Sequence, residues 1–187
     1  MTKIVMIRHG LPDYSFYDGK KYAGYGREFG VLSETGIKQA KDVSKDERLE
    51  GAQLIVSSPF TRSLQTAMLI SKEVGLDVEV QPGLHEWIPD FPYQFTSSDD
   101  YTQPNLDFIK YEGEKHPLST YNYETLQEIF DRAYKSLLPY LHYDKIIVVC
   151  HAVLMSAFEY KNDIDYCGII TFDFDASRVL DDNKGGR

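Results

Sequence analysis

The sequence predicts an α/β fold, a three-layer sandwich in which helices flank a mostly parallel central sheet. Short apolar runs alternate with segments of helical periodicity, which is typical of a parallel sheet. Two of these runs, residues 3–7 and 145–150, are largely apolar and fit strands covered on both faces. Since 187 residues suit one hydrophobic core, we expect a single domain over residues 1–187.

Five strands and four helices are expected in order along the chain. The strands are expected at residues 3–7, 53–58, 77–80, 145–150 and 168–174. Ser33, Glu34 and Thr35 can cap a helix that runs to about residue 48, and Pro59 suits the first position of the next helix. The apolar stripe of that second helix is expected at Phe60, Leu64, Ala67 and Met68. Further helices are expected at about 122–140 and from His151 to about Tyr160.

Two segments, residues 11–32 and 87–121, carry no periodic pattern. The first is rich in Gly, Tyr and Lys and too long for a simple connector, which indicates a functional or a disordered segment. We interpret the second as a cap-like insert, at about 88–121, that partly covers a site. The aromatic residues of both segments either pack together as a lid or stack on a substrate. Lys20, Lys21 and Arg27 either are solvated or attract a second anionic group.

The composition narrows the class of protein. A net charge of −9 argues against a nucleic-acid binder, which would show a basic face. No apolar run approaches the roughly 20 residues of a membrane span, and the first residues lack the form of a secretory signal. Cys150 and Cys167 form neither a disulfide framework nor a metal-ligand pattern, so we expect a cytoplasmic protein. The composition does not bear on the oligomeric state.

Polar residues follow the ends of several expected strands. Arg8, His9 and Gly10 follow the first strand, and His151 follows the strand at 145–150. Arg62 lies in the first turn of the helix after the second strand, and Glu86 follows the third. In a parallel sheet these strand ends meet at one edge, where ligands bind. Two guanidinium groups, two imidazoles and a carboxylate together predict a phosphate site.

The same residues suggest a reaction. Neutral His9 would attack phosphorus, and the neighbouring cations favour its neutral form. Glu86 is the favoured proton donor to the leaving group, with Asp13 and Asp90 as alternatives. The phosphohistidine would then be hydrolysed by water, with Glu86 acting as base. This chemistry requires no metal and no cofactor, and we expect none.

Several motifs carry a family resemblance. They are Arg8-His9-Gly10, the segment Leu32-Ser33-Glu34-Thr35-Gly36-Ile37-Lys38-Gln39-Ala40, the segment Ser57-Ser58-Pro59-Phe60-Thr61-Arg62-Ser63-Leu64-Gln65-Thr66-Ala67, Leu84-His85-Glu86, and a strand that ends in His151. Residues 3 to about 158 thereby resemble the histidine phosphatase superfamily, in its phosphoglycerate mutase-like branch. The resemblance implies that His9 accepts the phosphoryl group, that Arg8, Arg62 and His151 bind it, and that Glu86 donates the proton. Ala152 and the run Leu11-Pro12-Asp13 depart from the usual family pattern.

The leading functional hypothesis is a phosphatase of small phosphomonoesters, and a phosphoprotein substrate is a further option. A mutase that protects its phosphohistidine from water is the first alternative. The second is a non-catalytic module that binds phosphorylated ligands. We expect such a module to have lost His9, Glu86 or one of the arginines, yet all are present.

Overall fold

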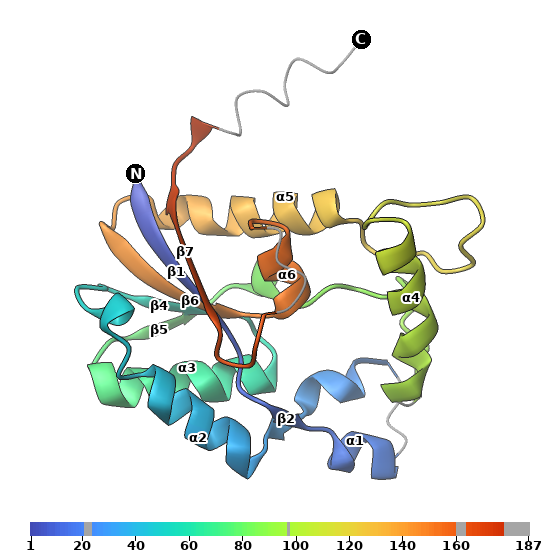
Figure 1. Cartoon of the computed structure of the whole chain (residues 1–187), viewed down its shortest axis with the longest axis horizontal. Coiled ribbons are helices and arrows are strands. Elements are labelled where there is room, and N and C mark those ends of the chain that lie inside the picture. Colours follow the sequence, from blue (N-terminus) through green and yellow to red (C-terminus); the bar gives the residue numbers. More distant parts are fainter. Residues whose placement is uncertain (21–23, 97, 160–163, 178–187) are drawn as a thin grey trace.

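The computed structural model describes residues 1–20, 24–96, 98–159 and 164–177. Its centre is a five-stranded sheet in the order β5-β4-β6-β1-β7 (Figure 1). The strands are β5 (Val78–Val80), β4 (Ile55–Ser57), β6 (Lys145–Cys150), β1 (Thr2–Arg8) and β7 (Ile169–Phe174). All neighbouring pairs are parallel except β1 with β7. The expected mostly parallel sheet is confirmed.

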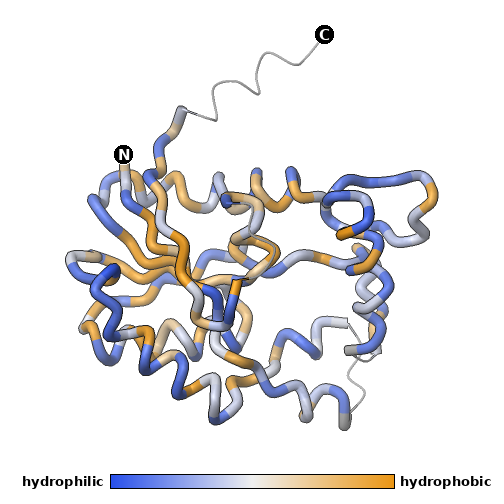
Figure 2. Tube along the Cα trace, in the orientation of Figure 1, coloured by the Kyte–Doolittle hydropathy of each residue, from blue (hydrophilic) through white to orange (hydrophobic). Residues whose placement is uncertain are grey.

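Helices cover both faces of the sheet (Figure 1). Helices α2 (Glu34–Val43) and α3 (Thr61–Val74) lie on one face, and α5 (Leu126–Leu137) and α6 (Ala152–Ser156) lie on the other. A hydrophobic core lies on each face of the sheet. Alternate residues of β1 pack into one core or the other, because successive side chains of a strand point to opposite faces. Val5 packs in the core on the α3 side, whereas Ile4 packs in the core on the α5 side. The strands form the apolar centre in Figure 2.

The apolar stripe expected at Phe60, Leu64, Ala67 and Met68 is only partly right, because Ala67 is buried whereas Phe60 and Leu64 are half-buried. Met68 is 64% exposed, and the buried residues are Arg62, Ser63, Thr66, Ala67 and Ile70. These positions recur at intervals of three and four, so they form one face of the helix. Three of the five are polar because this face also reaches the end of β1, where the Thr66 hydroxyl accepts a hydrogen bond from the backbone N–H of Gly10.

The helix ends also differ from expectation. Helix α2 stops at Val43 and a short 3₁₀ turn, Glu47–Leu49, follows. Helix α3 begins at Thr61 rather than at Pro59. Helix α5 starts later than expected, at a capping box in which Thr125 and Glu128 satisfy each other's backbone N–H groups, and a 3₁₀ turn, Leu138–Tyr140, follows its end. The expected end of the last helix, residue 160, lies outside the described residues.

The two segments without pattern both contain short elements. Residues 11–32 hold β2 (Pro12–Asp13), α1 (Ser15–Lys20), the 3₁₀ helix Gly24–Phe29 and β3 (Val31–Leu32). The expected insert holds the 3₁₀ turn Ser98–Tyr101 and helix α4 (Thr102–Lys110). Helices α1 and α4 lie at the same end of the sheet (Figure 1). The rings of Tyr25 and Tyr93 stack at 4.1 Å, so the two segments pack on each other as a lid would.

In the part of the chain that the structure describes, no helix has the length and apolar character needed to cross a membrane. The assignment of residues 1–187 to one domain with a cap-like insert at 88–121 stays a prediction.

Candidate active site

The register of the sheet brings His9 beside His151. Strands β1 and β6 pair in parallel with Arg8 opposite Cys150, so each histidine follows the last paired residue of its strand. The backbone N–H of His9 donates to the carbonyl of Cys150 at 3.0 Å. The ring centroids of His9 and His151 are 5.1 Å apart, and both side chains are buried. The two imidazoles therefore form the base of a site at the carboxyl edge of the sheet.

The turn from β4 into α3 supplies partners to both rings. The Ser58 hydroxyl lies 2.8 Å from Nε2 of His151, and the Ser63 hydroxyl lies 3.3 Å from the same nitrogen. Arg62, in the first turn of α3, donates from Nε to Nε2 of His9 at 3.1 Å. One continuous motif, which contains Ser58, Arg62 and Ser63, thus contacts both histidines.

The hydrogen bonds of His9 define its tautomer. Nδ1 lies 2.8 Å from the carbonyl oxygen of Gly10, which can only accept, so Nδ1 carries the proton. Nε2 receives a hydrogen bond from Arg62, which can only donate, so Nε2 carries the lone pair. Both contacts assign the same neutral form, in which Nε2 is the nucleophilic atom.

The surroundings of the two imidazoles keep them uncharged. Burial, followed by the positive charge of Arg62, holds the pKa of His9 well below its ordinary value, and Arg8 and Arg27 act in the same direction. Burial and then Arg62 also hold the pKa of His151 well below its ordinary value. Both rings are therefore neutral at pH 7.

Two glycines from separate motifs support the backbone after His9. A Cβ on Gly10 would lie 2.6 Å from the carbonyl oxygen of Gly36, and a Cβ on Gly36 would lie 2.2 Å from that of Leu11. The Ser33 hydroxyl, which caps α2, donates to the Leu11 carbonyl at 2.9 Å, and Gln39 accepts from the Leu11 N–H at 2.9 Å. The start of α2 thus fixes the path of the chain that leaves β1.

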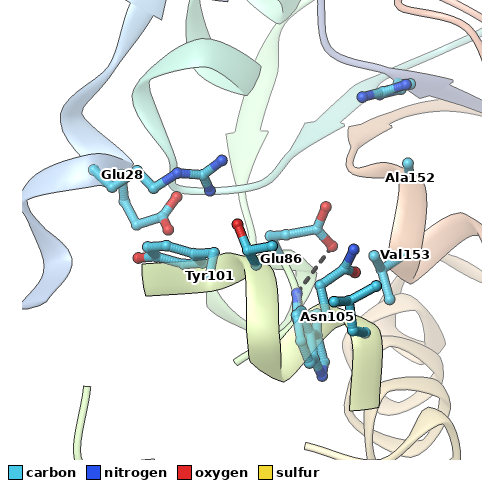
Figure 3. A pocket seen from close by; sticks show the side chains of 11 residues that line it. Glu28, Glu86, Tyr101, Asn105, Ala152 and Val153 are labelled. Atoms are coloured by element: carbon cyan, nitrogen blue, oxygen red, sulfur yellow. Dashed lines mark hydrogen bonds between the residues drawn. The ribbon is translucent and has the colours of Figure 1, made fainter. Parts of the chain in front are cut away.

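A cavity of about 430 Å³ lies at the end of β1 and the start of α6, where Arg8 and Ala152 line it (Figure 3). The residues that line it are Arg8, Arg27, Glu28, Glu86, Trp87, Tyr101, Thr102, Asn105, Leu106, Ala152 and Val153. Glu28 and Tyr101 lie on one side in Figure 3, and Ala152 lies on the other. Arg8 and Ala152 are the chain neighbours of His9 and His151. Of the five predicted site residues, Arg8 and Glu86 line this cavity, whereas His9, His151 and Arg62 do not. Arg62 is connected to the cavity wall through its ion pair with Glu28.

Glu86 is the carboxyl group best placed for proton transfer in the cavity. Its Oε1 accepts from the backbone N–H of Trp87 at 2.9 Å (Figure 3). Burial raises the pKa of Glu86, which favours its protonated form. The two alternatives have other contacts: Asp13 is exposed and accepts from the Ser15 N–H, and Asp90 accepts from the Asn122 N–H. Neither Asp13 nor Asp90 lines the cavity.

Four buried polar atoms at the site have no hydrogen-bond partner among the described residues. They are Nδ1 of His151, Nε of Arg8, Nε of Arg27 and the hydroxyl oxygen of Tyr101. Arg8 is oriented by its other contacts, since Nη1 donates to the Ile164 carbonyl and the guanidinium lies 3.8 Å from the centre of the Tyr166 ring. Unpartnered donors of this kind are suited to bind an anion.

No pattern in the sequence indicated Glu28, which is buried in the site. Its Oε2 accepts from Nη1 of Arg62 at 2.5 Å, and its Oε1 accepts from the Tyr93 hydroxyl at 2.8 Å. Through these bonds the segment at 88–121 is connected to the arginine that contacts His9. Of the three cations predicted in the first loop, Arg27 lines the cavity, whereas Lys21 lies outside the described residues.

Among the residues that the structure describes, no group of three or more His, Cys, Asp or Glu side chains could hold a metal ion.

Comparisons with known proteins identify the family of this chain. The model of the histidine phosphatase superfamily (branch 1) matches residues 4–161. Phosphoserine phosphatase 1 of Hydrogenobacter thermophilus is 25% identical over 181 residues, covering 92% of this chain and 78% of that protein. A probable phosphoglycerate mutase of Yersinia pestis is 31% identical over 86 residues, covering 46% of this chain and 38% of the relative. A mycobacterial glucosyl-3-phosphoglycerate phosphatase superposes with a TM-score of 0.70 at 20% identity, over 95% of this chain and 92% of that chain.

The structural likeness confirms the predicted fold, with a mostly parallel sheet between helices. The family match extends from β1 past His151, so it includes every motif from which the resemblance was stated. The chain belongs to the histidine phosphatase superfamily, branch 1.

Proposed function

We propose that this chain is a phosphatase that hydrolyses small phosphomonoesters through a phosphohistidine formed on Nε2 of His9. The observation that carries the proposal is the hydrogen bonding of His9, which leaves a neutral ring with its lone pair on Nε2. Family membership and the phosphatases among the relatives support the same reaction. The two cysteines favour a cytoplasmic location.

In the first step the phosphoryl group binds between Arg8, Arg62 and His151. The unpartnered Nε of Arg8 and Nδ1 of His151 supply donors for its oxygens, if the Ser58 hydroxyl donates to Nε2 of His151. Nε2 of His9 attacks phosphorus, the N–P bond forms and the P–O bond to the leaving group breaks. The Glu86 carboxyl group gives its proton to the departing oxygen, which leaves as an alcohol.

In the second step water hydrolyses the phosphohistidine. The Glu86 carboxylate removes a proton from water, the oxygen attacks phosphorus and the N–P bond breaks. Inorganic phosphate leaves, His9 is again neutral and Glu86 is again protonated. The site can therefore turn over with these side chains alone.

The cavity wall favours hydrolysis over mutase activity. Thr102, Asn105 and Leu106 of α4 line the cavity and are exposed, so water reaches this wall of the cavity. A mutase must keep water from its phosphohistidine, whereas a phosphatase must admit it. The same open wall would admit a phosphorylated side chain, so phosphoproteins are the second substrate class.

Hydrolysis of an aryl phosphate in excess chelator tests the proposal. We expect the wild type to release phosphate steadily and to carry covalently bound phosphate during turnover. Transfer to a phosphoglycerate acceptor without net release of phosphate would establish a mutase instead. Tight binding of vanadate without turnover of any ester would establish a binding module.

A further inference from the structure

Arg27 is a cation in the cavity wall without an anionic partner. Its guanidinium carbon lies 4.2 Å from the centre of the Tyr14 ring and 4.3 Å from that of Tyr101. Its Nε is buried and has no hydrogen-bond partner among the described residues. No carboxylate of the described chain forms an ion pair with it within 4 Å. Stacking between two rings orients the guanidinium but leaves its hydrogen-bond donors unused.

The other two arginines of the site differ from Arg27. The charge of Arg62 is paired with the buried carboxylate of Glu28. Arg8 directly precedes His9 in the chain, and it is proposed to bind the phosphoryl group. Arg27 lowers the pKa of His9 less than Arg62 or Arg8 does, which is consistent with a charge farther from the nucleophile.

The position of Arg27 relative to His9 decides which part of a substrate it meets. Attack on phosphorus is in line, so the leaving group points away from Nε2 of His9. His9 is buried, so the leaving group extends into the cavity. Glu28, the chain neighbour of Arg27, and its stacking partner Tyr101 lie across the cavity from Ala152 (Figure 3). Arg27 therefore belongs to the wall that receives the leaving group.

We infer that Arg27 binds a second anionic group, a carboxylate or another phosphate, carried by the leaving group of the phosphomonoester. This inference rests on the proposed phosphatase activity and names the substrate class for it. The planar guanidinium, held between two rings, offers paired donors to such an oxyanion. Arg27 is then a specificity-determining residue, and the phosphoryl group is bound without it.

A matched pair of esters tests this inference. In 3-phosphoglycerate a carboxylate replaces the hydroxymethyl group of glycerol 3-phosphate. We expect the wild type to prefer 3-phosphoglycerate in kcat/KM. Arg27→Met should lower kcat/KM for 3-phosphoglycerate about 10- to 100-fold and change that for glycerol 3-phosphate less than about twofold. Arg27→Lys should keep part of the preference, since it retains the charge and loses the planar fork.

Two controls isolate the leaving-group site. Arg48→Met removes an arginine from the exposed turn Glu47–Leu49, with the same change in net charge, and should leave both esters unaffected. The affinity for vanadate, which reports on the phosphoryl site, should be the same for Arg27→Met and wild type.

Each other outcome overturns the inference. An equal loss on both esters with weaker vanadate binding would place Arg27 at the phosphoryl group. Unchanged kinetics in Arg27→Met, or an aryl phosphate hydrolysed while neither ester of the pair is, would remove the leaving-group role and leave the proposed phosphatase intact. A wild type that hydrolyses no phosphomonoester, aryl phosphate included, would overturn the proposed function as well.

Discussion

Arg62 donates from Nε to the nucleophilic Nε2 of His9 at 3.1 Å, so the lone pair needed for attack is already hydrogen-bonded in the free enzyme. The same guanidinium uses Nη1 to bind the buried carboxylate of Glu28. The hydrogen bond from Nε of Arg62 to Nε2 of His9 must therefore break before the P–N bond forms, and a phosphate oxygen of the substrate can then accept it. Because Glu28 neutralises Arg62 at the same time, it reduces the attraction of the site for phosphate.

Glu28→Gln should show separately how the ion pair affects stability and how it affects anion binding. The variant keeps a side chain of the same size but leaves the charge of Arg62 uncompensated in a buried position. We expect the free energy of unfolding to fall by about 3–5 kcal/mol, as for other buried pairs that lose one partner. Vanadate should bind more tightly than to wild type, and it should raise the melting temperature of Glu28→Gln more.

The matched control for this prediction is Glu73→Gln, on the exposed side of α3. It makes the same change in net charge and should alter neither the melting temperature nor vanadate affinity. Vanadate binding that is weaker in Glu28→Gln than in wild type would show that Glu28 positions Arg62 for the anion rather than competing with it.

His9→Ala should abolish turnover of every phosphomonoester. The variant removes Nε2 of His9, the atom proposed to accept the phosphoryl group. The chelator used in the assay should not change the wild-type rate. Phosphate release and covalently bound phosphate are both measured, with His142→Ala, an exposed histidine, as the control. Wild-type rates in His9→Ala would refute the phosphohistidine mechanism.

Glu86→Gln should slow esters with poor leaving groups far more than activated aryl phosphates. An alkoxide needs the proton of Glu86, whereas a nitrophenolate leaves without it. The measurement is kcat/KM for a series of esters that differ in leaving-group pKa. A uniform loss across the series would assign Glu86 to binding rather than to proton transfer.

The pH profile of kcat/KM should reflect the ionisation of His9 and of Glu86. The pKa of His9 is lowered, so the neutral nucleophile persists as pH falls below about 6.5, and the acidic limb of kcat/KM lies below that value. The pKa of Glu86 is raised, so its proton is retained above the ordinary range of a glutamic acid, and loss of this proton gives the alkaline limb. Glu86→Gln should remove the alkaline limb for aryl phosphates, and a limb that persists would belong to another group.

Much of the site could be predicted because it depends on strand ends. Two apolar strands that each end in His, paired in parallel, place His9 beside His151 through the register alone. The position of Arg62 could be predicted because it lies in the first turn of α3, the helix after β4. The polar residues that share its face could not be anticipated as buried, since their burial depends on contacts with the end of β1. For that reason the apolar stripe expected at Phe60, Leu64, Ala67 and Met68 was right for Ala67, which is buried, and wrong for Met68, which is exposed.

Glu28 could not be predicted for a different physical reason. A lone glutamate in a loop rich in Gly and Tyr gives no periodic signal, and such a residue is usually solvated. Its burial is stabilised by partners far away in the sequence, Arg62 and the Tyr93 hydroxyl. Glu28 and Tyr93 both lie in the two segments where sequence patterns carry the least information.

Gly36→Ala should lower both stability and activity, although alanine is the better helix former. Gly36 lies in the first turn of α2, so helix propensity alone would favour alanine by up to about 1 kcal/mol. The added Cβ would lie 2.2 Å from the Leu11 carbonyl oxygen, and a contact with backbone at that distance must displace the chain after His9. We expect the free energy of unfolding to fall by about 1–3 kcal/mol and kcat to fall with it. Chemical denaturation measures the stability and aryl phosphate kinetics measure the activity. The control is Lys38→Ala, an exposed substitution in the same helix. A Gly36→Ala variant as stable and active as that control would show that the close approach of the two motifs is not required.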